Sequence, residues 1–120
     1  MPVAATACIY KICDQADWQN AIQANVFAGA GPDLQDGFIH FSAPHQLRAT
    51  AEKYFSGQND LMLLEVAVAD LPVGSLKWEA SRGGALFPHL YAPLPTGLVR
   101  RFWPLPADGT GHCFPEELNI

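Results

Sequence analysis

The stretch Asp36-Gly37-Phe38-Ile39-His40-Phe41-Ser42 predicts a short strand that leads directly into a helix. Successive side chains of a strand point to opposite faces, so Phe38 and His40 share one face and the apolar residues beside them share the other. Ser42 is expected to cap the following helix, with Pro44 in its first turn, because a serine side chain satisfies free backbone N–H groups there. The stretch therefore predicts a histidine and a serine beside a helix N-terminus, a position that favours an anion.

The elements around this stretch alternate between strand and helix before the chain becomes mostly strand. A buried strand is expected over 7–13, then a helix that Asp14 caps and Gly29 ends, and then a loop through Asp33. After the second helix, strands are expected over 61–68, 76–80, 87–91 and 98–103, and the tail shows no periodicity. Pro88 restricts its strand to an edge or an irregular conformation. This order predicts a single α+β domain over residues 1–120 rather than a doubly wound sheet.

The composition of the 120 residues excludes several classes of protein. Hydrophobic residues make up 49% and charged residues 16%, which excludes intrinsic disorder. No apolar run approaches the roughly 18 residues that cross a membrane. The formal net charge of -5, with Arg100 and Arg101 as the only adjacent basic pair, excludes a general DNA-binding surface.

The three cysteines, Cys8, Cys13 and Cys113, lack the spacing of a metal site. They are expected to be thiols in a reducing compartment, although a disulfide between Cys113 and one of the other two stays open. The apolar stretch 3–10 is too short for a signal peptide, and no basic region precedes it. A cytoplasmic protein is therefore expected.

Candidate chemistry is concentrated in polar residues that lie beside aromatic ones. His40 and Ser42 have the same parity and so point the same way, although a buried structural histidine and a simple cap are the alternatives. Glu79, which follows Trp78, would bind a pair of hydroxyls or polarise a nucleophile. The alternative for Glu79 is a solvated charge that protects an edge strand.

A third group lies in the strand expected over 87–91. Tyr91 would stack on a planar ligand and His89, two residues earlier on the same face, would donate or accept a proton. Ordinary packing of the aromatic rings is the alternative. No metal site is predicted, because His40 and His89 lack metal-ligand spacing. The sequence also contains no phosphate-binding loop and no nucleophile elbow.

Taken together, these motifs resemble the bacterial family known as domain of unknown function 952, over about residues 9–105. The residues that carry the resemblance are Ile9-Tyr10-Lys11-Ile12, Trp18, the stretch from Asp36 to Ser42, Gln46, Trp78-Glu79 and Phe87-Pro88-His89-Leu90-Tyr91. The family is similar in fold to the ADP-ribosyltransferases and to the tRNA 2′-phosphotransferase. The resemblance thus implies a split, strongly curved antiparallel sheet with two helices, which holds NAD in a central cleft.

The resemblance also implies roles for residues in the first half of the chain. The first strand would present Tyr10 or Lys11 to NAD, and Lys11 would hold a phosphate or a ribose by its charge. His40 and Ser42 match a similar His-x-Ser that lines the phosphotransferase site.

The second half of the chain completes the implied site. Tyr91 would stack on the nicotinamide ring of NAD, and Glu79 would contact the ribose, with Trp78 beside it in the cofactor site. No metal is implied. The partner would be a small nucleotide or anion rather than DNA or a membrane, and the oligomeric state is not predicted.

Three functions stay open from the sequence. An enzyme would transfer an ADP-ribosyl or phosphoryl group with His40, Glu79 and His89 as catalytic residues, since a carboxylate stabilises an oxocarbenium-like transition state. A non-catalytic module would bind a nucleotide or a small anion through His40, His89 and Tyr91. A structural domain predicts that the two histidines lie apart, so two rings within about 10 Å in one solvent-reachable cleft would contradict it.

Overall fold

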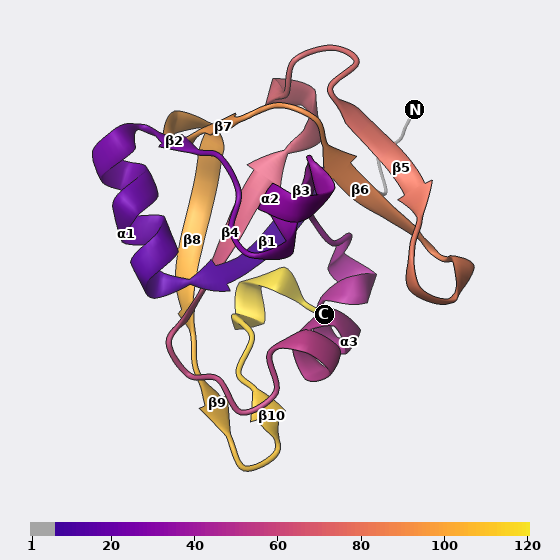
Figure 1. Cartoon of the computed structure of the whole chain (residues 1–120). Coiled ribbons are helices and arrows are strands. Elements are labelled where there is room, and N and C mark those ends of the chain that lie inside the picture. Colours follow the sequence, from indigo (N-terminus) through magenta and orange to yellow (C-terminus); the bar gives the residue numbers. More distant parts are fainter. Residues whose placement is uncertain (1–6) are drawn as a thin grey trace.

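A three-stranded antiparallel sheet lies at the centre of the computed structural model, which describes residues 7–120, with the backbone alone at Arg82 (Figure 1). Strand β4 (Leu61–Ala67) lies between β1 (Cys8–Asp14) and β8 (Val99–Leu105). The sequence of β4 is nearly continuously apolar because both of its faces are buried. The prediction of a central strand over 61–68 is confirmed.

A second three-stranded antiparallel sheet carries the two candidate histidines. Strand β6 (Leu86–Leu90) lies between β3 (Ile39–His40) and β5 (Leu76–Ala80). Just beyond β3, Ser42 exchanges two backbone hydrogen bonds with Tyr10 of β1, at 2.8 and 2.9 Å, and joins the two sheets. The α+β prediction is confirmed, whereas the likeness to the ADP-ribosyltransferase fold stays a prediction.

Pro88 lies in the middle strand of this second sheet and not at its edge, which leaves the irregular conformation of the two that were expected. Its carbonyl accepts the N–H of Phe41 at 3.0 Å. The nitrogen of a strand residue faces the same side as its carbonyl, and on that side the ladder with β3 has already ended at the pair His40–His89. The N–H that proline lacks is the one that would donate back to the carbonyl of Phe41, so the ladder between β3 and β6 goes no further.

Three α-helices of the described residues pack around the sheets, one more than expected. Helix α1 (Gln15–Ala24) follows β1 and buries Trp18 and Ala21. Helix α2 (Pro32–Asp36) occupies a region that was expected to be a loop, and Gly37 ends it with a φ of 82° that favours glycine. A helix of five residues is too short to show helical periodicity, which explains why the sequence did not predict it.

Helix α3 (Leu47–Tyr54) begins differently from the prediction, because Ser42 does not cap it. A 3-10 turn, Pro44–Gln46, precedes the helix. The side-chain oxygen of Gln46 accepts the N–H of Ala43 at 2.9 Å, so a residue inside the turn binds the backbone of the residue just before the turn. The backbone of Ser42 is instead part of the bridge between the two sheets.

Short strand pairs and 3-10 turns complete the chain. Strand β2 (Val26–Phe27) pairs with β7 (Leu94–Pro95), and β9 (Ala107–Asp108) pairs with β10 (Gly111–His112). The tail thus contains a hairpin although its sequence shows no periodicity. The other 3-10 turns are Val68–Asp70, Arg82–Gly84, Thr96–Leu98 and Glu116–Leu118.

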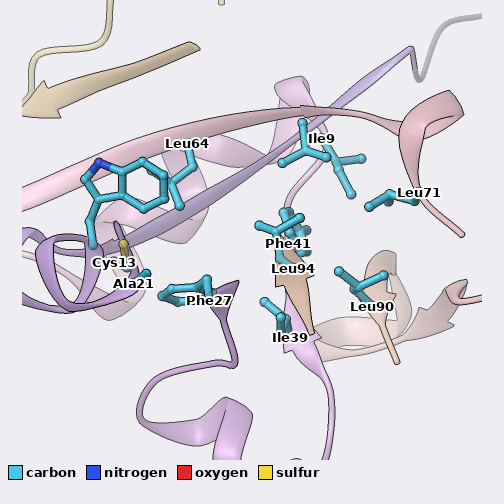
Figure 2. Packing of buried hydrophobic residues seen from close by; sticks show 12 residues of the cluster. Ile9, Cys13, Ala21, Phe27, Ile39, Phe41, Leu64, Leu71, Leu90 and Leu94 are labelled. Carbon is cyan, nitrogen blue, oxygen red and sulfur yellow. The ribbon is translucent and has the colours of Figure 1, made fainter. Parts of the chain in front are cut away.

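The sheet of β1, β4 and β8 separates two hydrophobic cores. The first core contains Ile9 and Leu64 together with α1 and the inner faces of β3 and β6 (Figure 2). The second core lies on the other face and contains Ile12, Leu63 and the buried side of α3. Because β4 contributes to both cores, its position fixes the two halves of the molecule relative to each other.

Three further predictions concern the cysteines, a membrane-spanning segment and the start of the chain. Cys8, Cys13 and Cys113 are free thiols, so the disulfide that the sequence left open is not formed. Within residues 7–120 no helix is long and apolar enough to cross a membrane. Residues 3–6 of the stretch considered as a signal peptide lie outside the described residues.

Candidate functional site

A cavity of about 470 Å³ lies along the edge of β1 that faces away from β4. Its wall is formed by β1, the start of α2, β3, one side of α3 and part of β6. A cavity of this volume is typical of small-molecule sites. The predicted site residues Tyr10, Lys11, His40, Ser42 and His89 all line it.

His40 and His89 are directly paired across β3 and β6 and meet on the wall of this cavity. Their ring centroids are 5.4 Å apart, in an edge-on arrangement. Phe38 packs against both rings, with centroid distances of 4.5 Å to His40 and 4.1 Å to His89. The expectation for a purely structural domain, that the two histidines lie apart, is therefore wrong.

The carboxylate of Asp33 holds His40 in place, and the sequence did not predict this role. Asp33 is almost fully buried and accepts hydrogen bonds from the N–H groups of Ala30 and His40, from His40 Nδ1 at 2.6 Å and from Lys11 Nζ. Burial alone would raise the pKa of Asp33, but the His40 hydrogen bond and the charge of Lys11 outweigh burial and lower it to about 2. Pro32, in the first turn of α2, was the one local signal for the helix that positions Asp33.

Both ring nitrogens of His40 face carboxylates. Nδ1 lies 2.6 Å from Asp33 and Nε2 lies 3.0 Å from Asp36. Ionised carboxylates only accept hydrogen bonds, so both contacts form together only when His40 carries both ring protons. His40 is thus arranged as a donor on either side.

His89 is held differently, by a single carboxylate. Its Nδ1 lies 2.9 Å from Oε1 of Glu79, and the same oxygen accepts the hydroxyl of Tyr91 at 2.7 Å. The hydroxyl of Tyr91 and the ring of His89 lower the pKa of Glu79. Glu79 and Tyr91 therefore lie behind His89 rather than on the cavity wall.

Trp78, which was predicted to lie in the cofactor site, is not among the residues that line this cavity. Because successive side chains alternate, Trp78 lies on the face of β5 opposite to Glu79 and packs against the first core.

The two predicted residues of β1 have structural partners. Lys11 forms a buried ion pair with Asp33 at 2.9 Å, so its charge is already compensated. The hydroxyl of Tyr10 donates to Glu65 at 2.8 Å, and burial together with this carboxylate raises the pKa of Tyr10. The hydroxyl of Ser42 lies 3.0 Å from that of Thr50, on the wall formed by α3.

The open edge of β1 presents backbone hydrogen-bonding groups to the cavity. In an antiparallel strand, the N–H and C=O groups of every second residue point to the same edge. Tyr10 uses its outward groups to bind Ser42, so the next outward pair belongs to Ile12, which lines the cavity. Neither of these two groups has a hydrogen-bond partner within residues 7–120.

Carboxylates outnumber cations on the described part of the cavity wall. Asp14, Asp17, Asp33 and Asp36 line it together with Lys11, which is already paired. This charge favours a cationic or hydroxyl-rich group over an anion. In the described part of the chain, no group of three or more His, Cys, Asp or Glu residues is arranged to hold a metal.

Comparisons with known proteins place the chain beside uncharacterised relatives. The family model of DUF952, described as a protein of unknown function, matches residues 12–102. The crystal structure of protein CC0527 from Caulobacter crescentus is 46% identical, with a TM-score of 0.87, and the match covers 94% of this chain and 99% of that one. The solution structure of CC0527 is 49% identical over 89% of this chain and 91% of that one, with a TM-score of 0.79. A search of curated proteins finds no match.

Proposed function

The chain belongs to the DUF952 family, and from the geometry of its cleft we propose that it binds NAD and cleaves the bond between nicotinamide and ribose. In this proposal the nicotinamide end of NAD enters the cavity beside Ile12, His40 and His89. The ADP-ribosyl group then passes to water or to a hydroxyl-bearing acceptor. A cytoplasmic location is part of the proposal, because the free thiols fit a reducing compartment.

The observation that carries the proposal is the outward N–H and C=O pair of Ile12. A carboxamide offers a donor and an acceptor side by side, so it pairs with one strand residue as a neighbouring strand would. Nicotinamide carries such a carboxamide on a flat ring. The recessed edge of β1 therefore supports recognition of this group.

The charge of the cavity wall supports the same ligand. The nicotinamide ring of NAD is cationic, and positive charge moves to the ribose as the bond to nicotinamide breaks. Asp14, Asp17 and Asp36 line the cavity and stabilise both charges, because carboxylates near a developing cation lower its energy. A small inorganic anion is a poorer ligand for this wall.

Binding without chemistry is the second candidate, and one observation favours it. The resemblance assigns a ribose contact to Glu79, but Glu79 lies behind His89 and outside the cavity wall. A module of this kind would bind the nicotinamide end of NAD through Ile12 and release no nicotinamide.

Calorimetric titration with NAD and two analogues tests the proposal. Nicotinic acid adenine dinucleotide replaces the carboxamide with a carboxylate, which cannot donate to the C=O of Ile12 and which Asp36 repels. We expect NAD to bind and the acid analogue to bind at least about tenfold more weakly, a difference of about 1.4 kcal/mol. ADP-ribose, which lacks nicotinamide, is expected to bind more weakly as well.

A chromatographic assay of nicotinamide release accompanies the titration and separates the two candidates. Binding with release supports cleavage, and binding without release supports the non-catalytic module. No heat at millimolar NAD together with no release contradicts both, and equal affinity for all three ligands contradicts recognition through Ile12.

A further inference from the structure

We propose that His89 is the general base of this cleft, that it accepts the proton on Nε2, and that Glu79 positions it. The inference rests on the proposed function for the reaction that the base would serve. The supporting geometry involves only His89 and its neighbours, so the tautomer of His89 can be tested without any ligand.

The carboxylate of Glu79 determines the tautomer of His89. Its Nδ1 lies 2.9 Å from the carboxylate of Glu79, which accepts hydrogen bonds only. In the neutral ring the single proton therefore sits on Nδ1, and Nε2 keeps its lone pair. The hydroxyl of Tyr91 donates to the same oxygen of Glu79 and fixes that carboxylate in turn.

Nε2 of His89 is accessible although most of the side chain is buried. The side chain of His89 is only 6% exposed, yet it lines the cavity. Within residues 7–120, Nε2 has no hydrogen-bond partner. If Nε2 were also inaccessible to solvent, it would be a buried polar atom without a partner, and among the described side-chain nitrogens and oxygens Trp18 Nε1 is the only such atom. Nε2 of His89 is therefore open to the cavity rather than enclosed in the protein.

Neighbouring rings hold the imidazole ring of His89 in one orientation. Phe38 stacks on His89 with an interplanar angle of 25°, and His40 meets it edge-on at 67°. These contacts and the bond to Glu79 keep the ring from rotating, so the lone pair has a fixed direction. A base that is held in this way needs no reorganisation when the reaction occurs.

His40 does not compete for the same role. Both of its nitrogens face carboxylates, Asp33 and Asp36, so each already has a polar partner. The two histidines therefore have different roles: His40 donates hydrogen bonds, and His89 accepts the proton.

The proposed step balances in atoms and electrons. As the oxygen of water or of an acceptor hydroxyl bonds to the ribose carbon, its proton passes to Nε2 of His89. The carbon–nitrogen bond to nicotinamide breaks, and its electron pair goes to the ring nitrogen, which loses its positive charge. His89 then releases the proton to solvent, so NAD and water give ADP-ribose, nicotinamide and one proton.

Nitrogen-15 NMR of the histidine rings tests the tautomer in the protein without ligand, at about pH 9, above the ordinary histidine pKa of about 6.5. We expect Nδ1 of His89 to be protonated and Nε2 to be bare. In Glu79→Gln the amide presents either a donor or an acceptor to Nδ1, so the Nε2–H tautomer is expected to gain population. Tyr91→Phe, which leaves the carboxylate in place, is expected to keep the wild-type tautomer.

Nicotinamide release and NAD affinity are then measured on the same variants. We expect His89→Gln to lower release by about 10² to 10⁴-fold and to leave NAD affinity within threefold, because a general base acts in the transition state. Glu79→Gln is expected to lower release in parallel with its loss of the Nδ1–H tautomer. Retained affinity shows that each variant is folded.

The outcomes separate this inference from the proposed function. An Nε2–H tautomer in the wild type overturns the inference, as does wild-type release by His89→Gln. If NAD neither binds nor is cleaved, the proposed function fails, and the wild-type tautomer alone decides whether His89 is a positioned base.

Discussion

At the scale of single residues, the cleft depends on Asp33. This side chain connects β1, the start of α2 and β3 through Lys11, its own helix and His40. Four donors surround one buried carboxylate, so removal of the charge leaves Lys11 buried without a counter-ion. A buried ion pair that loses one partner is strongly destabilised.

We expect Asp33→Asn to lower the free energy of unfolding by about 3 to 5 kcal/mol at pH 7 in urea titrations. The pH dependence gives a second readout. The pKa of Asp33 is lowered from 3.8 to about 2, so its contribution, about 2 kcal/mol, is full above pH 4 and is lost as the pH falls toward 2. Asp33→Asn should therefore lose less stability than the wild type between pH 4 and pH 2.

The control for this prediction is Asp70→Asn, in an exposed turn. It is expected to change the free energy of unfolding by less than about 0.5 kcal/mol at pH 7 and to keep the acid dependence of the wild type. Equal acid sensitivity of Asp33→Asn and the wild type would show that another carboxylate controls stability in this range.

The sequence predicted individual site residues better than it predicted their partners. Strand alternation correctly placed His40 with Phe38, and His89 does lie on the cavity wall. Asp33 was not predicted, because nothing local distinguishes a buried carboxylate from an ordinary one in a polar loop. Its burial depends on Lys11, which is distant in sequence.

At the scale of elements, Gln46 decides how α3 begins. Its Oε1 accepts the N–H of Ala43 and its Nε2 donates to the carbonyl of Leu86 at 2.8 Å, so one side chain joins the start of the helix to β6. The expected cap, Ser42, lies one residue before the cap position of the 3-10 turn; its backbone bridges to Tyr10 and its hydroxyl contacts Thr50. Capping rules consider only local sequence, whereas a sheet contact from a distant strand decided the outcome here.

We expect Gln46→Glu to lower the free energy of unfolding by about 1 to 3 kcal/mol at pH 7. The carboxylate still accepts from Ala43 but cannot donate to Leu86, and it places a charge where Gln46 is nearly buried. Urea titration measures the loss. The matched variant Gln19→Glu, on the exposed side of α1, should stay within about 0.5 kcal/mol of the wild type, and a similarly small change for Gln46→Glu would contradict the role of this side chain.

At the scale of the whole molecule, one sheet with a core on each face makes the two halves unfold together. Leu64 of β4 lies in the first core and Leu63 in the second, and both are fully buried. The element order predicted this α+β arrangement because long strands and helices show clear periodicity. The elements that the sequence did not predict include α2, the pair of β2 and β7 and the hairpin of β9 and β10, which are all too short to show any.

We expect Leu63→Ala and Leu64→Ala each to lower the free energy of unfolding by about 2 to 5 kcal/mol, since each leaves a cavity in a packed core. Circular dichroism and tryptophan fluorescence should report one coincident transition for both variants, because Trp18 lies in the first core and Trp103 packs against the second. Leu34→Ala, at a residue that is 67% exposed, is the control. Two separate transitions in either core variant would show that the halves unfold independently.

The recess along β1 has a consequence for self-association. A strand edge with free N–H and C=O groups is a template on which another chain adds, and this addition begins many aggregates. In β1 the outward groups of Tyr10 are occupied by Ser42, and α1 begins at Gln15, so Ser42 separates the outward pair of Cys8 from that of Ile12. A single isolated pair of N–H and C=O groups cannot start a ladder of strands, but it is enough to bind a small flat amide. The same recess that admits a ligand therefore protects this edge from edge-to-edge aggregation with other copies of the chain.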